Sequence, residues 1–559
     1  MNENATTDWV PVTKALEDIK EADRRLGRKL RVVILGAGMA GLAAGYELAS
    51  LGHTVTIYEG SRRVGGRVWT HRWADGTHAE FGPMRIPDVH DYTTHYTHKV
   101  RLDKERLEFF NKNFGFDFRG RVVPDLSAII RRSELHPQEV EWVDKDGVGG
   151  LLGGLMKPIL DELQGNHTLR RALIAGDFTV PRLRVLDAMT WHQYLLSRRP
   201  SEHALDLVGR GLSLAAVWHW SLAAALRDEL HQWKYKRLWC LKDGMDELPA
   251  RLAKAARDAG VDIRDGHRVQ RLTLLANGRG RVHFADGRES VPFERLLCTL
   301  PSRVMRGEGF LNGPFSERKR RAIQEYSYIS SNKVLYRFDD IGWTPREQGR
   351  YISDQGIRGG FSDPTAPGLR QAYFAPNKPF DKETPDLAAA GQEDSAMFRQ
   401  YIGDAPEPSD LVGETDAEAA QACPGAMLAS YSVEKGSRGY PDDDAEAARL
   451  VLALLRRLHP TAPTPVDAVV HRWDKNEWSQ GALAITPPGQ LTQHIAALRE
   501  KSGNIYFAGE HVSIAPGWIQ GALESSLREV RNMLVGARLQ PNEDEATEAA
   551  TPTEKESVS

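Results

Sequence analysis

The sequence has few cysteines and no long apolar run. Only Cys240, Cys298 and Cys423 occur among 559 residues. Their number is odd and they lie far apart, so they indicate neither a disulfide framework nor a clustered metal site, and a reducing cytoplasm is the expected location. No stretch approaches the roughly 20 apolar residues that a membrane helix requires. The polar, acidic N-terminus also lacks the features of a secretory signal, so we expect neither a membrane partner nor export by the general route.

A strong charge of one sign is also missing. The formal net charge is −3, with 27% charged and 41% hydrophobic residues, which is typical of a soluble globular protein. The basic runs at 131–132 and 318–321 are short and scattered. We interpret them as solvated helix faces and expect no nucleic-acid partner. The length itself exceeds one ordinary core and predicts two or three domains, which can be interleaved.

A glycine motif follows the first apolar run. Residues 31–35 have the β-branched content of a buried parallel strand, and the chain continues as Gly36-Ala-Gly38-Met-Ala-Gly41 into a helical pattern over 42–51. Residues 54–58 then supply a second strand that ends at Glu59. This spacing predicts a βαβ unit that binds a dinucleotide.

Each residue of this motif has a physical reason. Gly36 permits the tight turn, Gly38 lets the backbone approach a pyrophosphate, and Gly41 lets the helix pack closely on the strand. The helix N-terminus offers unpaired N–H groups to the phosphates. Glu59 is placed to accept hydrogen bonds from the ribose hydroxyls and would repel a ribose 2′-phosphate.

Further motifs in the same order resemble the flavin-containing amine oxidases over most of the chain. They are Arg63-Val-Gly-Gly-Arg67, the stretch 241–249, Val269 after a strand, Cys298-Thr-Leu-Pro301, Ile505-Tyr-Phe-Ala-Gly-Glu-His511 and the stretch 516–525. The resemblance implies an α/β fold in which an FAD-binding, Rossmann-like domain is interleaved with an α+β substrate-binding domain and a helical insert. It also implies FAD as the cofactor.

The expected organisation follows from this resemblance and from the composition along the chain. Strand patterns at 261–264, 268–274 and 281–284, the last two joined as a hairpin, belong to the cofactor domain. The predicted divisions are an N-terminal extension (1–30, helical over 12–30), a discontinuous FAD-binding domain (31–100, 236–310 and 471–539), a helical insert (101–235, with helices at 153–163 and 205–230), a substrate-binding domain (311–470) and a disordered acidic tail (540–559).

The C-terminal motif predicts a second helix N-terminus facing the cofactor, after Gly509-Glu510 and Gly517. Some relatives bind FAD through a cysteine, but none occurs in the matching stretch 478–483, so we expect noncovalent FAD. The residues expected to contact FAD are Gly36, Gly38, Met39, Ala40, Gly41, Glu59, Gly60, Gly66, Arg67, Gly82, Pro83, Met84, Arg85, Val269, Trp473, Gly509, Glu510, Gly517, Trp518 and Ile519.

On the substrate side, the stretch from Glu80 to Pro87 resembles the L-amino acid oxidase branch of the family. There the arginine matching Arg85 holds the substrate carboxylate, which suits the two parallel hydrogen bonds of a guanidinium. Tyr431 resembles the tyrosine that makes a second carboxylate contact. The alternative interpretation of Arg85 is a surface or structural arginine, and that of Tyr431 is a residue of a strand core.

Two further positions complete the expected site. Lys333 resembles the buried lysine that holds a water beside the flavin, although a lysine on a strand is as often an exposed edge residue. Gly517 and Trp518 resemble the wall beside the substrate amine. Trp218, Trp220, Trp473 and Trp478 suit either an aromatic-lined pocket or a plain core.

The reaction implied by the resemblance is oxidative deamination of an L-amino acid by O2, with hydride transfer to flavin N5. It yields a 2-oxo acid, ammonia and hydrogen peroxide. We expect a bulky apolar or aromatic substrate, with lysine and arginine left open. Alternatives are an amino-acid 2-monooxygenase, an amine or polyamine oxidase, and a flavin-binding module without redox turnover. A homodimer is the default expectation for a soluble oligomer.

Overall fold

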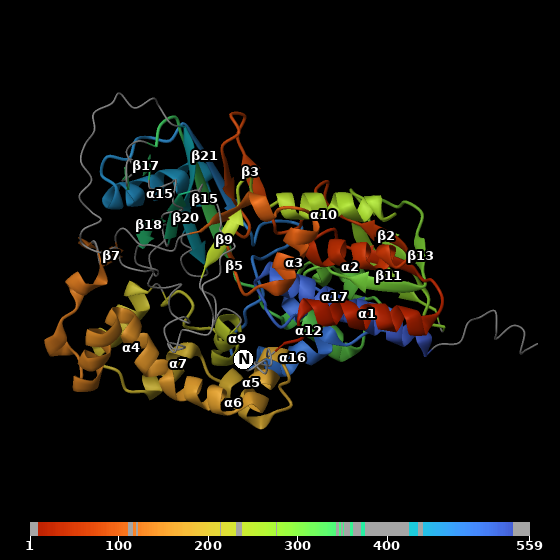
Figure 1. Ribbon diagram of the computed structural model, residues 1–559, viewed down its shortest axis with the longest axis horizontal. Helices are drawn as coiled ribbons and strands as arrows, with labels where there is room; N and C mark the ends of the chain where they lie inside the picture. Colours follow the sequence, from red (N-terminus) through yellow and green to blue (C-terminus); the bar gives the residue numbers. More distant parts are fainter. Residues whose placement is uncertain are drawn as a thin grey trace, which may run out of the picture.

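The computed structural model describes residues 9–109, 116–118, 121–123, 125–212, 214–230, 237–275, 277–341, 346–347, 350–351, 358–361, 371–374, 424–433 and 440–539. The predicted acidic tail 540–559, Cys423 and most of 342–423 lie outside the described residues. Figure 1 shows three regions: a sheet wrapped by helices, a second sheet beside α15 (Asp444–Leu458), and a group of helices that lies below both.

The first region is a parallel five-stranded sheet in the order β10-β2-β1-β14-β22. Its central strand β1 (Arg31–Leu35) is buried at four of five positions, because helices cover both faces of such a sheet. The other strands are β2 (Thr54–Tyr58), β10 (Asp262–Arg264), β14 (Arg295–Cys298) and β22 (Ile505–Phe507). The predicted βαβ unit is confirmed, with helix α2 (Met39–Ser50) between β1 and β2.

Helices α10 (Glu247–Asp258) and α17 (Ile519–Arg538) pack against α2 (Figure 1). The predicted hairpin is also confirmed: β11 (Val269–Leu274) pairs antiparallel with β12 (Gly280–Phe284), and β13 (Val291–Phe293) extends this small sheet. A two-stranded sheet consists of β3 (Thr70–Arg72) and β4 (His78–Glu80). A three-stranded sheet has the order β5 (Ile86–Pro87), β9 (Leu238–Leu241) and β6 (Arg106–Glu108).

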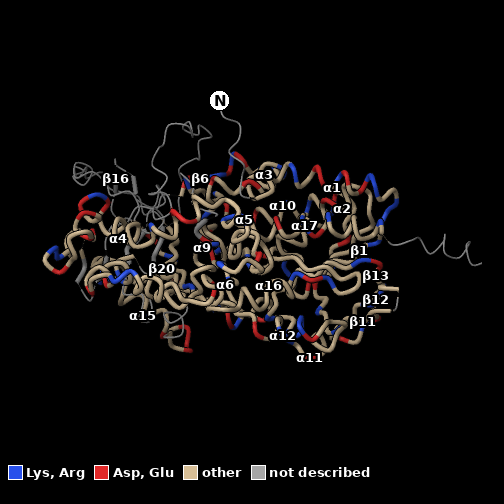
Figure 2. Tube along the Cα trace, turned by 90° about the horizontal axis from the view of Figure 1, so that it is seen from below, with Lys and Arg blue, Asp and Glu red and all other residues tan. Residues whose placement is uncertain are grey.

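The N-terminal helix is shorter than the sequence pattern predicted. α1 spans Val12–Leu26 and ends at Gly27, whose φ of 70° is left-handed, so the predicted continuation to Leu30 is wrong. Its buried residues Val12, Ile19 and Ala22 form a stripe that packs on α17. Most of the other positions are charged, and Figure 2 shows basic and acidic residues interspersed along the helix.

The second region is a seven-stranded sheet in the order β21-β15-β20-β19-β18-β7-β8. β15 (Ser331–Phe338) lies between β20 (Gly425–Val433) and β21 (Asp467–Arg472), antiparallel to both, and packs α15 on one face. The remaining strands are β19 (Gln371–Phe374), β18 (Arg358–Phe361), β7 (Phe116–Phe118) and β8 (Arg121–Val123), with the separate pair β16 (Arg346–Glu347) and β17 (Arg350–Tyr351).

The third region contains the predicted helices of the insert. Its helices are α4 (Pro137–Gly165, kinked at Asp146–Gly147), α5 (His167–Ala175), α6 (Pro181–Asp187), α7 (Trp191–Ser197), α8 (Glu202–Asp206) and α9 (Leu222–Leu230). The predicted continuous helix over 205–230 is wrong, because a π-helical turn at Leu207–Gly211 and further turns separate α8 from α9.

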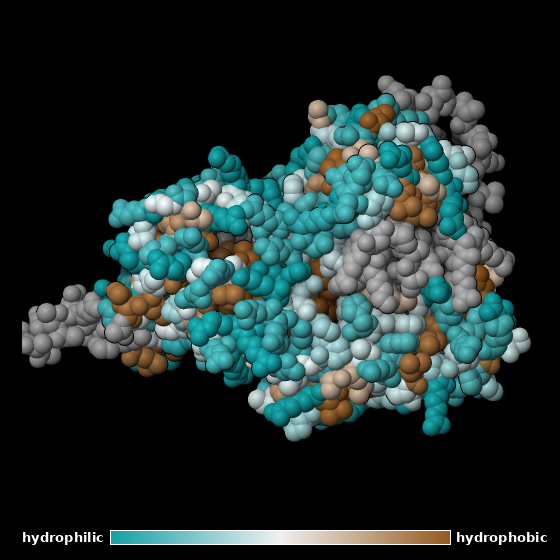
Figure 3. Space-filling model, turned by 180° about the vertical axis from the view of Figure 1, so that it is seen from behind, coloured by the Kyte–Doolittle hydropathy of each residue, from teal (hydrophilic) through white to brown (hydrophobic). Residues whose placement is uncertain are grey.

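The remaining helices are α3 (Asp91–Lys99), α11 (Glu308–Leu311), α12 (Glu317–Glu325) and α16 (Gln490–Arg499). In α12 the basic run 318–321 is not wholly solvated as predicted: Lys319 is 1% exposed and its Nζ donates to the carbonyls of Ala497 and Leu498 at the end of α16. The surface in Figure 3 is mainly hydrophilic, with apolar side chains in scattered groups. No helix among the described residues is long and apolar enough to span a membrane.

Candidate active site

A cavity of about 1430 Å³ extends from the glycine loop of the parallel sheet to the strands of the second sheet. Most of the residues predicted to bind the cofactor or substrate line it. They are Gly36, Gly38, Met39, Ala40, Glu59, Gly60, Gly66, Arg67, Gly82, Pro83, Val269, Lys333, Tyr431, Trp473, Gly509, Glu510, Gly517, Trp518 and Ile519. Residues that lie hundreds of positions apart in the sequence therefore surround one space.

The glycine loop has the geometry that a dinucleotide needs. Gly36 has a φ of +97°, and a Cβ on Gly41 would lie 2.0 Å from the Gly36 carbonyl oxygen, so only glycine allows α2 to pack this close to the turn. Gly41 does not line the cavity, which agrees with a packing role. A Cβ on Gly38, in contrast, would meet no atom within 4 Å, so the cavity lies open in front of this residue.

Both helix N-termini at the cavity present backbone N–H groups. Gly38 caps α2 and Trp518 caps α17, and neither makes a side-chain capping hydrogen bond. The first N–H groups of a helix have no partner within the helix, and with the helix dipole they favour an anion. The two ends therefore suit the pyrophosphate and the electron-rich ring carbonyls of FAD, and the residues present fit this cofactor.

Glu59 orders the loop from the end of β2. Its carboxylate accepts from the N–H of Ala37 at 2.7 Å, and from the N–H and hydroxyl of Ser61 at 2.9 and 2.8 Å. It is 8% exposed and lines the cavity. The carboxylate is held at the edge of the cavity, where it can also accept from a ribose hydroxyl.

An ion pair joins the two cofactor motifs. Arg67 donates to a Glu510 carboxylate oxygen at 2.6 Å and to the Ala482 carbonyl at 3.0 Å. Burial alone would raise the pKa of Glu510, but Arg67 and the N–H of Gly517, 2.9 Å away, outweigh it and the pKa is lowered. Glu510 thus stays charged and ties the loop at Gly517 to Arg67.

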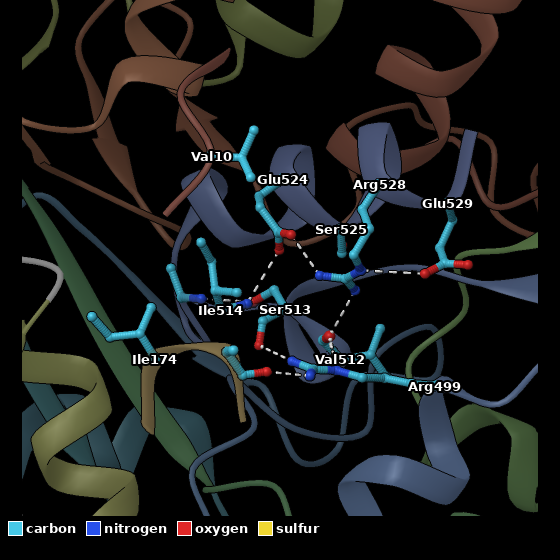
Figure 4. A network of polar contacts seen from close by, with 12 residues as sticks. Val10, Ile174, Arg499, Val512, Ser513, Ile514, Glu524, Ser525, Arg528 and Glu529 are labelled. Atoms are coloured by element: carbon cyan, nitrogen blue, oxygen red, sulfur yellow. Dashed lines mark hydrogen bonds and ion pairs between the residues drawn. The ribbon is translucent and has the colours of Figure 1, made fainter. Parts of the chain in front are cut away.

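The loop that leads to Gly517 is fixed from behind by a group of arginines (Figure 4). Arg499 donates to the carbonyls of Val512 and Ser513 at 2.7 and 2.9 Å. Arg528 donates to Glu524 at 2.5 Å, and Glu524 accepts from the N–H of Ile514 at 3.2 Å. These contacts hold the backbone in the conformation that leads into the positive φ of Gly517, +83°.

Three side chains form a row across the second sheet. Lys333 on β15 is the register partner of Tyr431 on β20 and of His471 on β21, and all three line the cavity. Directly paired residues in antiparallel strands point to the same face. Lys333 is 3% exposed, so its alternative reading as an exposed edge lysine is wrong. Its Nζ donates to the Gly82 carbonyl at 2.5 Å and lies 5.0 Å from the Tyr431 ring centroid.

The surroundings lower the pKa values of two members of this row, Lys333 and His471. Burial lowers the pKa of Lys333; Glu80 opposes this shift and Arg85 adds to it. Burial also raises the pKa of Glu80, whose carboxylate accepts from Thr70 at 3.0 Å and from the N–H of Met245 at 2.8 Å. Burial, Lys333 and Arg63 lower the pKa of His471 to about 4, so this imidazole is neutral near pH 7.

Arg85 and Met84 do not line the cavity. Arg85 is half-buried, and its charge acts on both Lys333 and Asp228, whose pKa values it lowers. Burial nevertheless raises the pKa of Asp228 to about 6. Asp228 in turn accepts from the Trp518 indole at 2.8 Å. Arg85 is therefore an electrostatic neighbour of Lys333, which lines the cavity, and of Asp228, which contacts Trp518.

Sequence reasoning missed His471 and Asp228. His471 was detectable, because it lies on β21 two positions before Trp473, which follows the end of this strand, and both residues line the cavity. Trp473 itself donates to the Phe81 carbonyl at 2.9 Å. No sequence signal marks Asp228.

Among the other tryptophans, Trp478 lines the cavity, whereas Trp218 stacks on His192 and Trp220 belongs to the core of the helical region.

The described residues contain no cluster of three or more potential metal ligands. The described cysteines, Cys240 and Cys298, are free and buried. Neither of these two cysteines lines the cavity, whose lining includes the row on the second sheet and the residues at the two helix N-termini.

Known proteins resemble this chain over most of its length. A family model described as flavin containing amine oxidoreductase matches residues 39–534. The flavin-dependent L-tryptophan oxidase of Lentzea aerocolonigenes is 27% identical over 90% of this chain and 98% of that protein. An L-amino-acid oxidase of Sistrurus catenatus edwardsii is 26% identical over 90% of this chain and 86% of its own length.

Solved structures show the same fold. A putrescine oxidase bound to putrescine has a TM-score of 0.62 at 19% identity, covering 91% of this chain and 99% of that one. The cyclohexylamine oxidase of Brevibacterium oxydans has a TM-score of 0.61 at 18% identity, covering 92% and 99%. The predicted fold class, an FAD-binding Rossmann-like domain within a mixed α/β architecture, is confirmed.

Proposed function

The chain belongs to the flavin-containing amine oxidoreductase family and uses FAD, and from this premise we propose that it is an L-amino acid oxidase. The observation that carries the proposal is the half-buried Arg85, whose charge lowers the pKa values of Lys333, which lines the cavity, and of Asp228, which accepts from Trp518. A cation there suits a substrate carboxylate, which a simple amine lacks. The L-tryptophan and L-amino-acid oxidases among its relatives support this choice.

The proposed reaction converts an L-amino acid, O2 and water into a 2-oxo acid, ammonia and hydrogen peroxide. The chemistry that bound FAD supplies is two-electron oxidation of the α-carbon, with dioxygen as the final acceptor. The released imino acid is then hydrolysed by water. The protein itself contributes binding, orientation and control of protons.

Each residue of the site has a part in this reaction. Arg85 and the Tyr431 hydroxyl hold the carboxylate, and the carbonyl of Gly517 accepts from the amino group. Trp518 forms the wall beside the substrate. Lys333, buried and hydrogen-bonded to the Gly82 carbonyl, holds a water and supplies or withdraws a proton at its Nζ. The neutral His471 keeps additional positive charge away from Lys333.

We further propose noncovalent FAD and a bulky apolar or aromatic substrate. The stretch 478–483 has no cysteine, so denaturation with acid should release all of the FAD into the supernatant; colour retained in the precipitate would contradict this. The aromatic lining by Trp473, Trp478 and Trp518, together with the L-tryptophan oxidase relative, supports the substrate preference.

Anaerobic mixing of the yellow protein with single amino acids tests the proposal. An L-amino acid should bleach the flavin, and air should restore its colour with release of peroxide. Bleaching by putrescine or by decarboxylated amines in preference to amino acids would support the amine-oxidase alternative. An amide product with loss of CO2 would support the monooxygenase alternative. A flavin that none of these compounds reduces would contradict a redox function.

A further inference from the structure

Two consecutive residues of helix α9 contact the loop that forms one wall of the cavity. The Arg227 guanidinium, 1% exposed, donates to the Ser513 carbonyl at 2.8 Å. Asp228 accepts from the Trp518 indole nitrogen at 2.8 Å. The helical region therefore contacts the loop at both of its ends. Of the two contacted residues, Trp518 lines the cavity and Ser513 does not.

The backbone at the start of this loop makes several hydrogen bonds with side chains, whereas the Trp518 side chain at its end makes one with Asp228. The carbonyl of Ser513 also accepts from Arg499, and the next residue is tied to Glu524, so several contacts fix the start of the loop (Figure 4). An indole N–H, in contrast, is a single donor with no acceptor capacity. Asp228 takes that one donor, so this contact sets how the Trp518 ring is turned.

Asp228 is also affected by the charge of Arg85, which is proposed to bind the substrate carboxylate. It is half-buried, and the neighbouring Arg85 is close enough to lower its pKa against the effect of burial. The carboxyl group thus contacts Trp518 directly and interacts with the charge of Arg85. The His90 ring makes a T-shaped contact with the Trp518 ring, with centroids 5.0 Å apart.

We propose that Asp228 is a positioning residue for the reaction, which orients the Trp518 indole against the substrate. This inference rests on the proposed function, because it assumes that the substrate lies between Arg85 and Trp518. Small displacements of a bound substrate slow its reaction strongly, by as much as 100-fold for about 1 Å. Loss of Asp228 should therefore lower kcat more than it weakens FAD binding.

A double-mutant cycle between Asp228 and Trp518 tests the inference. We expect Asp228→Ala to lower kcat/KM roughly 10- to 100-fold, mainly through kcat. Asp228→Asn keeps an acceptor oxygen and should remain within about threefold of the parent. Trp518→Phe should lose about as much as Asp228→Ala, and the double variant should fall no more than about threefold below Trp518→Phe.

A matched pair outside the cavity provides the control. The Trp73 indole donates to an Asp467 carboxylate oxygen at 2.7 Å, and neither residue lines the cavity. Asp467→Ala removes the same kind of hydrogen bond and should leave kcat/KM within about twofold of the parent. An additive cycle, or an Asp228→Ala variant as active as the parent, would overturn the inference.

A spectroscopic measurement separates this inference from the proposed function. The chain has 13 tryptophans, and in protein labelled with ¹⁵N-tryptophan the indole signal missing from Trp518→Phe belongs to Trp518. This signal should move in Asp228→Ala, and move much less in Asp228→Asn. A signal unmoved in Asp228→Ala would refute the contact even if no amino acid reduces the parent flavin. If the signal moves as expected but amino acids fail as substrates, the proposed function is at fault.

Discussion

Lys333 and His471 face each other across the antiparallel pair of β15 and β21, and both line the cavity. Burial lowers the pKa of Lys333, and burial together with the charges of Lys333 and Arg63 lowers the pKa of His471. A buried lysine placed between an aromatic ring and an imidazole is the group in this cavity best suited to hold a water and exchange a proton.

Replacement of Lys333 should separate chemistry from cofactor binding. Lys333→Met keeps a side chain of similar volume but removes the donor to the Gly82 carbonyl. We expect FAD content to remain unchanged, while reduction and reoxidation of the flavin, followed by stopped flow, slow by at least tenfold. Rates equal to those of the parent would remove Lys333 from the mechanism.

Truncation of Arg85 should affect amino acids selectively. Arg85→Ala leaves the substrate carboxylate without its partner, which costs on the order of 3–5 kcal/mol. This corresponds to a loss of roughly a hundredfold to several thousandfold in kcat/KM for the best L-amino acid. Arg182→Ala, which breaks an exposed ion pair with Glu162, serves as the control. Activity of Arg85→Ala within a few fold of the parent would contradict the amino-acid assignment.

Two glycines of the same motif should fail in different ways. A Cβ at Gly41 would lie 2.0 Å from the Gly36 oxygen, so Gly41→Ala should destabilise the apoprotein by roughly 1–3 kcal/mol or more. A Cβ at Gly38 meets nothing in the protein but projects where the cavity opens. Gly38→Ala should keep the Tm of the apoprotein and weaken FAD binding, measured by flavin fluorescence. Equal effects on Tm would contradict the two roles.

The buried Lys319 predicts a specific dependence of stability on pH. Burial lowers its pKa to about 7, against smaller upward effects of Cys298, Glu500 and Glu529. Between pH 7 and the ordinary lysine pKa of about 10.4, the unfolded chain binds this proton and the folded chain does not. The contribution of Lys319 to the free energy of unfolding therefore increases with pH in this window, by about 1.4 kcal/mol per pH unit at most.

Comparison of variants isolates this effect. Lys319→Met should show a smaller rise, or a steeper fall, of Tm between pH 7 and 9 than the parent. Lys254→Met replaces an exposed lysine and should follow the parent. Parallel Tm curves for the parent and Lys319→Met would show that Lys319 stays charged in the folded protein.

Local patterns in the sequence determined the cofactor half of this protein. The strand 31–35, the glycines and Glu59 specify a βαβ unit within 29 residues of chain, because turn geometry, helix packing and helix N-termini act between neighbours in sequence. The family motifs extended this to FAD and to the residues at Glu510 and Gly517. Helix ends were predicted less well, since Gly27 and the π-helical turn interrupt patterns that hydrophobic periodicity alone would continue.

Only the tertiary structure decided what surrounds the substrate. The row of Tyr431, Lys333 and His471 depends on strand register, which links residues up to 138 positions apart through backbone hydrogen bonds that no local pattern encodes. The burial of Lys319 depends in the same way on where the end of α16 lies. Asp228 reaches Trp518 across 290 positions, because packing of the helical region brings α9 against the loop before α17.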